Sequence, residues 1–358
     1  MARPSPTEGN GAPLPDRNFI PGNTIAPAAP RGLSFRAMPR LRFAPYAWGV
    51  VVFSFAVIVW GAYVRASGSG AGCGSHWPLC NGTVLQRDPA IETIIELGHR
   101  TTSFVALLLV VGLVALARRD FPAGHIVRRA AWATLFFMVT EALVGAGIVL
   151  LRLVADNDSL ARAVYLGVHL VNTFLLLAAM TLTAWWGSGQ SAPVLPADWR
   201  RLAPMLGVLG GLLLVGITGA ITALGDTLFP AGSLAEGMRQ DASPTAHILL
   251  RLRVFHPILA LTVGAVLLAL AVRVTLRDAS PATAHMGRVA AGLVLVQVAG
   301  GVLNLLLLAP IWMQMVHLFL ADLVWLSAVL LTASVAAEAS AIASGLGSPA
   351  LDTAIAHR

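Results

Sequence analysis

The sequence predicts an all-α integral membrane protein with eight transmembrane helices. Hydrophobic residues make up 57% of the 358 residues and charged residues only 11%, whereas soluble domains carry about 25% charged residues. The apolar residues gather in runs of about 20, the length that crosses a hydrocarbon core of about 30 Å as a helix. No run alternates like a strand, and open strand edges cannot persist in lipid. We therefore expect the membrane-crossing segments to be helices.

Charged or Pro- and Gly-rich breaks separate the eight apolar runs. Residues 1–42 have neither an apolar period nor the apolar core of a secretory signal, so we expect a disordered cytoplasmic tail. Residues 341–358 are expected to form a second cytoplasmic tail. The expected spans are 43–66, 93–117, 127–151, 160–186, 201–224, 247–274, 285–308 and 311–336.

Arginines cluster on one side of the predicted spans, in the first tail and in the connections after the second, fourth and sixth spans. The alternate connections carry fewer arginines and several acids. By the positive-inside rule both termini are cytoplasmic, and we expect the inner membrane of a bacterium. The net charge of +7 is thus a topology signal. It gives no reason to expect nucleic acid, and membrane lipid is the expected surrounding.

The two halves of the chain resemble each other at an offset near the 157 positions that separate His99 from His256. The stretch "IIELGHR" aligns with "RLRVFHP", "TEALVGAG" with "VQVAGGVL", and "YLGVHLVN" with "WMQMVHLF". Each half holds four spans, an even number, so both halves enter the membrane in the same sense. The repeat predicts two tandem four-helix bundles, 43–190 and 191–340, related by a pseudo-two-fold axis along the membrane normal. Some transporters also have parallel repeats.

Four histidines lie inside apolar helices, where ionisable residues are rare and usually functional. They are His99, His169, His256 and His317. At 1.5 Å per residue, all four lie about 9–13 Å from the outer ends of their spans. Each half contributes one from its second helix and one from its fourth. Two imidazoles on facing helices can hold a haem iron inside a bundle. Zinc is less favoured because no third ligand set is nearby.

Three arginines near the outer ends, Arg65, Arg100 and Arg253, are suited to pair with haem propionates. The alternative is that they extend to the lipid headgroups. The two interpretations weigh equally for Arg65, and the haem role is favoured for Arg100 and Arg253.

One acid distinguishes the halves. Glu96 precedes His99 by three residues, which places both on one helical face, whereas Arg253 occupies the equivalent position of the second half. Either Glu96 serves only the helix dipole, or it is a proton acceptor beside a haem that is acted upon. Glu141 is deeper, and is either a hydrogen-bonding link between helices or a proton relay.

The only two cysteines, Cys73 and Cys80, lie in a Gly-rich loop on the predicted outer side. Thiols there can oxidise, and a disulfide across seven residues is sterically easy. A structural staple and a redox role both stay open.

The motif "GAYVRASGSGAGC…WPLCNG" followed by "ELGHR" closely resembles the heme A synthase family, and the resemblance covers about residues 43–335. It implies a substrate site for heme O formed by Glu96 with His99 and His169. It also implies a permanent heme b on His256 and His317 and a Cys73–Cys80 disulfide. Two features depart from the family. Ser75-His76 stands where an acid often precedes Trp-Pro, and the loop 225–246 lacks the second cysteine pair of some members. A mechanism that needs two disulfides therefore does not apply.

The resemblance predicts a membrane oxidoreductase that converts the C8 methyl of heme O to a formyl group through two water-derived hydroxylations. The product, heme A, would serve terminal oxidases. Heme O synthase and an unidentified electron acceptor are expected partners, and a homo-oligomer is compatible with the sequence. The alternative is a diheme cytochrome b that exchanges electrons with quinone, but this leaves Glu96 and the cysteine loop unexplained. A transporter with parallel repeats leaves the histidines unexplained.

Overall fold

The computed structural model describes residues 38–83, 87–193, 199–277 and 279–343. This part of the chain is helical and contains eight segments long and apolar enough to cross a membrane, which confirms the all-α fold class. Residues 1–37 and 344–358, most of the two predicted tails, lie outside the described residues. The helices of the first half are α1 (Met38–Ala66), the short η1 (Ser69–Ala71), α2 (Ile91–Asp120), α3 (Ile126–Leu150) and α4 (Leu160–Gly187).

The second half differs from the predicted spans at two places. The predicted sixth span, 247–274, is divided at Val254, because Pro257 has no backbone N–H to offer to a carbonyl one turn earlier. A short helix also lies in 225–246, where only a loop was predicted. The helices of this half are α5 (Trp199–Leu228), α6 (Leu234–Ala242), α7 (Ile248–Arg253), α8 (Phe255–Leu276), α9 (Pro281–Leu306) and α10 (Ile311–Ala343).

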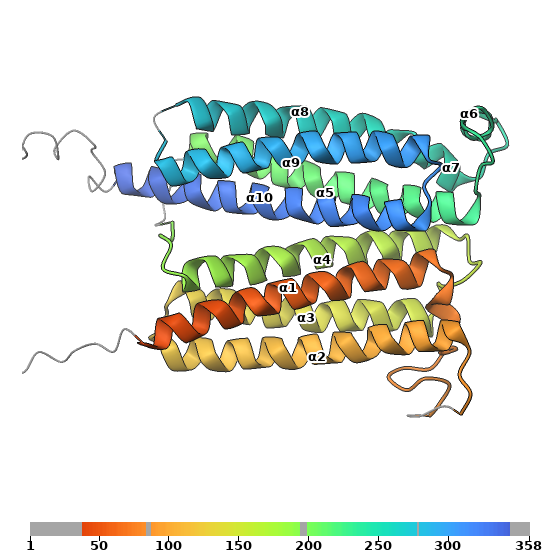
Figure 1. The fold of residues 1–358 in the computed structure, drawn as a ribbon, viewed down its shortest axis with the longest axis horizontal. Helices are drawn as coiled ribbons and strands as arrows, with labels where there is room; N and C mark the ends of the chain where they lie inside the picture. The colour runs from red at the N-terminus through yellow and green to blue at the C-terminus, as the bar shows by residue number, and fades with distance from the viewer. Residues whose placement is uncertain (1–37, 84–86, 194–198, 278, 344–358) are drawn as a thin grey trace, which may run out of the picture. The chain divides into compact units, whose positions relative to one another are not determined.

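The long helices pack as two groups of four (Figure 1). In the first group each helix contacts the next along the chain, and α1 also contacts α4. In the second group α5 contacts α8, α8 contacts α9, α9 contacts α10, and α10 contacts α5. Helices α4 and α5 also contact each other across the two groups, and the division into two tandem bundles stays a prediction. The pseudo-two-fold axis between them stays a prediction.

Helices α4, α1 and α10 meet where the two groups join. The Phe174 and Trp325 rings stack with centroids 5.1 Å apart, and the Trp325 indole N–H donates to the Phe174 carbonyl at 2.7 Å. Phe55 packs edge-on against Phe319 at 5.1 Å. Phe55, Phe174 and Trp325 are buried and Phe319 is exposed, and this aromatic cluster joins the two halves.

Both long connections, the cysteine loop and the loop with α6, lie at the same end of the helices (Figure 1). We call this end the disulfide side. Cys73 and Cys80 are bonded to each other there, with an S–S distance of 2.00 Å, so the predicted disulfide is confirmed.

Candidate haem sites

The structure places the four intramembrane histidines at one level, near the disulfide side. They come from α2, α4, α8 and α10. Counted from the first residue of α2, α4, α7 and α10, they lie about 9–14 Å from that end at 1.5 Å per residue. Each half therefore offers two imidazoles, one from each of two helices.

A glycine on the preceding long helix makes room for each imidazole. A Cβ added at Gly61 would lie 2.7 Å from the His99 ring. At Gly219 and at Gly301 the added atom would lie 3.0 Å from the rings of His256 and His317. At Gly145 it would lie 3.8 Å from the His169 ring.

These glycines repeat at nearly the offset that separates His99 from His256, and sequence reasoning missed them. Gly219 follows Gly61 by 158 positions and Gly301 follows Gly145 by 156. The shared spacing was the signal that could have found them. A side chain at Gly61, Gly219 or Gly301 would push against the imidazole that packs there.

The second-half pair has the spacing of axial haem ligands. The ring centroids of His256 and His317 lie 6.5 Å apart, with the ring planes at 88°. A metal–imidazole bond is about 2 Å long, so two such bonds in line set the centroids about 6 Å apart. The separation of the two rings is therefore close to that of two histidine ligands of one haem iron.

The imidazole nitrogens have different partners in the two halves. His169 Nδ1 lies 3.5 Å from a Glu141 carboxylate oxygen, and His256 Nδ1 lies 3.2 Å from the Thr218 hydroxyl. Within the described chain, Nδ1 of His99, His169 and His317 is buried without a hydrogen-bond partner, so the contact between His169 and Glu141 is not a hydrogen bond. Buried polar atoms in proteins are usually satisfied, so these three imidazoles keep unused hydrogen-bonding capacity. The feature that fits a haem iron is the pairing of two imidazoles from two helices in each half.

Glu96 is buried and holds the disulfide loop. One carboxylate oxygen accepts from Nε and Nη2 of Arg100, at 3.1 and 2.5 Å. The other accepts from the backbone N–H of Cys73 at 2.8 Å. Arg100 also donates to the His76 and Leu79 carbonyls, at 2.7 and 2.9 Å. The acid that was predicted to be catalytic thus lies one turn before His99, at the base of the loop.

The other two predicted propionate arginines bond to protein groups. Arg65 donates to the Ala223 carbonyl at 3.0 Å, to the Thr227 hydroxyl at 3.2 Å and to the Gln314 side chain at 3.1 Å. It therefore links α1 to both α5 and α10.

Arg253 pairs with two acids that sequence reasoning had assigned only to topology. It donates to Asp226 at 2.8 Å and to Asp241 at 2.6 and 2.9 Å. These bonds tie α6 to the ends of α5 and α7. Arg253 therefore does for the second loop what Arg100 does for the first.

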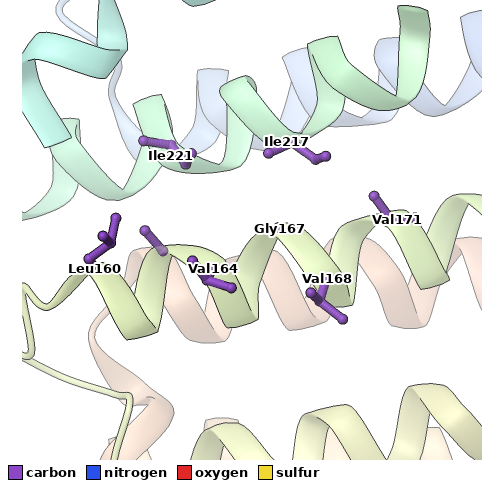
Figure 2. A pocket seen from close by; sticks show the side chains of 8 residues that line it. Leu160, Val164, Gly167, Val168, Val171, Ile217 and Ile221 are labelled. Carbon is purple, nitrogen blue, oxygen red and sulfur yellow. The ribbon is translucent and has the colours of Figure 1, made fainter. Parts of the chain in front are cut away.

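A groove of about 330 Å³ runs between α4 and α5 (Figure 2). Two lining residues are sequence neighbours of site residues. Val168 precedes His169, and Ile217 precedes Thr218, whose hydroxyl contacts His256. An apolar lining of this kind suits a hydrocarbon chain and disfavours a charged group. The lining residues are Leu160, Ala163, Val164, Gly167, Val168, Val171, Ile217 and Ile221.

A family model described as cytochrome oxidase assembly protein matches residues 44–329, which include all four histidines and the disulfide loop. This chain belongs to the heme A synthase family. The protein named Heme A synthase of Exiguobacterium sibiricum is 33% identical over 165 residues, which are 46% of this chain and 53% of the relative. That of Symbiobacterium thermophilum is 38% identical over 136 residues, 38% of this chain and 42% of the relative.

A longer relative has a different name. The Thermus thermophilus protein named Protoheme IX farnesyltransferase is 49% identical over 294 residues, which are 82% of this chain. The chain spans 48% of that relative's length, so the relative's name describes a protein about twice as long. This chain is therefore similar both to proteins named Heme A synthase and to part of a protein named Protoheme IX farnesyltransferase.

Proposed function

We propose that this chain is a heme A synthase that oxidises the C8 methyl group of heme O to a formyl group. One observation carries the proposal: each half of a family member presents two half-buried imidazoles at the same depth. The similarity to a Thermus protein named for haem farnesylation adds support, because heme O is a farnesylated haem.

The first half takes the substrate and the second half keeps a heme b. The two carboxylates near the histidines of the first half favour that assignment. Glu141 lies beside His169, and Glu96 lies one turn before His99. In the second half the groups beside the imidazoles are neutral, the Thr218 hydroxyl and the Gln297 amide. An oxidation that releases protons needs acceptors near the substrate, whereas a haem that only passes electrons does not.

The reaction converts a methyl group and one water, overall, into a formyl group, four protons and four electrons. Each hydroxylation inserts one water-derived oxygen and releases two protons and two electrons, and the resulting gem-diol then loses water. Glu96 is the proposed first proton acceptor, and a positioned base of this kind typically contributes 10²–10⁴-fold in rate. A heme b held by the second half would pass these electrons, one at a time, to the external electron acceptor that is expected as a partner.

Glu96 and Arg100 also close the site. Their bonds to Cys73, His76 and Leu79 hold the disulfide loop over the end of α2. The disulfide is a staple in this proposal. It keeps the loop compact while the Glu96 carboxylate stays beside the substrate.

The orientation follows the arginine distribution, with the disulfide side on the outer face of a bacterial inner membrane. Heme O synthase is the proposed source of the substrate.

A conversion assay tests the function. Membranes that contain the protein are incubated with heme O, and the extracted haems are separated and identified by mass. The wild-type protein is expected to produce heme A. The Glu96→Gln protein is expected to accumulate heme O or the hydroxylated intermediate while it keeps its heme b spectrum. A spectrum of bound haem without any formyl-haem product from the wild-type protein would instead identify a diheme electron carrier.

A further inference from the structure

The histidine on the fourth helix of each half has a different polar neighbour. Glu141 on α3 and Gln297 on α9 stand 156 positions apart, at equivalent places in the repeat. A Glu141 oxygen lies 3.5 Å from Nδ1 of His169. The Gln297 amide nitrogen lies 3.4 Å from Nε2 of His317. The first half thus presents a carboxylate to Nδ1 of its histidine, whereas the second half presents an amide to Nε2.

The Glu141 carboxylate is held in place by α4. Asn172 donates to one of its oxygens at 2.6 Å, and Thr173 bonds the other. The Asn172 amide is itself oriented, because its nitrogen donates to the Phe137 carbonyl at 2.9 Å and its oxygen accepts from Thr140 at 2.6 Å. The carboxylate therefore cannot turn away from His169 without breaking this network.

A carboxylate beside Nδ1 has a specific effect on a metal-binding histidine. When it accepts the Nδ1 hydrogen, it fixes the tautomer, leaves Nε2 free to bind the metal and makes the imidazole a stronger donor. Glu141 lies 3.5 Å from Nδ1 of His169, so a small movement of the ring would form this bond. Such partners tune the redox behaviour of haem iron. A merely structural link between α3 and α4 would not need the negative charge, since a glutamine can make similar bonds to Asn172 and Thr173.

We propose that Glu141 is a positioning residue for His169. Glu141 holds the His169 imidazole so that Nε2 meets the iron of the substrate haem, and it makes this nitrogen a stronger electron donor to the iron. The inference rests on the proposed function in so far as the first half takes a haem. Glu141 and Gln297 have side chains of similar shape, so the proposed difference between the two halves is the negative charge of Glu141.

Haem binding tests this inference independently of turnover. Purified protein that keeps its resident haem is titrated with protohaem, and binding to the first half is followed by absorbance. The Glu141→Gln protein is expected to bind the added haem about 10–100-fold more weakly than wild type. The midpoint potential of that haem should rise, because a weaker donor stabilises the ferric state less.

Matched variants complete the design. Thr140→Val removes a bond from the same network without touching Glu141, and it should leave both haem affinity and potential close to wild type. Glu141→Asp keeps the charge on a shorter side chain, and should fall between wild type and Glu141→Gln. The resident-haem spectrum checks folding in each case.

Two results would overturn the inference. Wild-type affinity and potential in the Glu141→Gln protein would show that the charge is not used, while the proposed function would still stand. Equal losses in Thr140→Val and Glu141→Gln would assign the effect to packing of α3 on α4. If the wild-type protein itself bound no added haem, the substrate site in the first half, and with it the proposed function, would fail.

Discussion

The two halves share one helical framework and differ in the chemistry placed upon it. Both pack four long helices and set two imidazoles against glycines at matched depth. The acid Glu141 adjoins His169 of the first half, whereas neutral groups adjoin the two histidines of the second. The framework thus explains how each half could hold a haem, and the side chains around the histidines explain why the two haems would have different fates.

The loops repeat this contrast. The first loop has a disulfide and the bonds of Arg100, and its acid, Glu96, bonds to Arg100 and to the Cys73 backbone one turn before His99. The second has no cysteine in the sequence, and its acids Asp226 and Asp241 are paired with Arg253. An arginine organises each loop, but the acid of one loop is proposed to take part in chemistry and the acids of the other are structural.

Removing the axial ligands should have the largest effect and should separate the halves. His256→Ala is expected to abolish the low-spin b-type absorbance of the purified protein, because the ring that faces His317 at 6.5 Å would be lost. His99→Ala is expected to keep that absorbance and lose heme A formation. Absorbance spectra of the two purified proteins, measured at equal concentration, check this. Loss of the b-type signal in both variants would show that the halves do not hold their haems independently.

Glu96 and Arg100 can be separated by comparing their rates. If Glu96 is the proton acceptor, Glu96→Gln should slow conversion of heme O by 10²–10⁴-fold. Arg100→Ala disturbs the same loop but leaves the carboxylate in place, so its rate should fall much less. Both rates are measured in the conversion assay after heme b content is matched. Equal losses in the two variants would reduce Glu96 to an anchor for the loop.

The glycine positions predict a smaller and graded effect. A methyl group at Gly61 would meet the His99 ring at 2.7 Å, but one at Gly145 would be in ordinary contact with His169 at 3.8 Å. Overpacking a well-packed site typically costs about 1–3 kcal/mol. Gly61→Ala should therefore weaken haem binding to the first half, and Gly145→Ala should be tolerated. Protohaem titration of both variants measures the difference. A stronger effect at Gly145 would contradict the packing that the structure shows.

The framework was predictable from sequence because it rests on local rules. Length and hydropathy identified the eight spans, and the offset between the halves aligned the histidines. The break before Phe255 was missed although Pro257 signals it, since the apolar run continues through it. The short helix α6 was missed because it is polar and has no place in a pattern of membrane spans.

The partners of the charged groups could not be predicted in the same way. Asp226 and Asp241 reach Arg253 only because α6 folds back over the ends of α5 and α7. Likewise, Glu96 bonds to a backbone N–H 23 residues away, and backbone groups leave no signal in a sequence. Periodicity indicates which face of a helix carries a side chain, but the contacts of that side chain depend on how loops close.

The haem content of the purified wild-type protein tests the division between the halves most directly. The protein is isolated from a host that makes heme O, and its haems are extracted, identified by mass and counted per chain. The proposed division of labour predicts protohaem from the second half together with heme O, its hydroxylated form or heme A from the first. Protohaem alone, at two per chain, would contradict it and would make both halves electron-carrying sites.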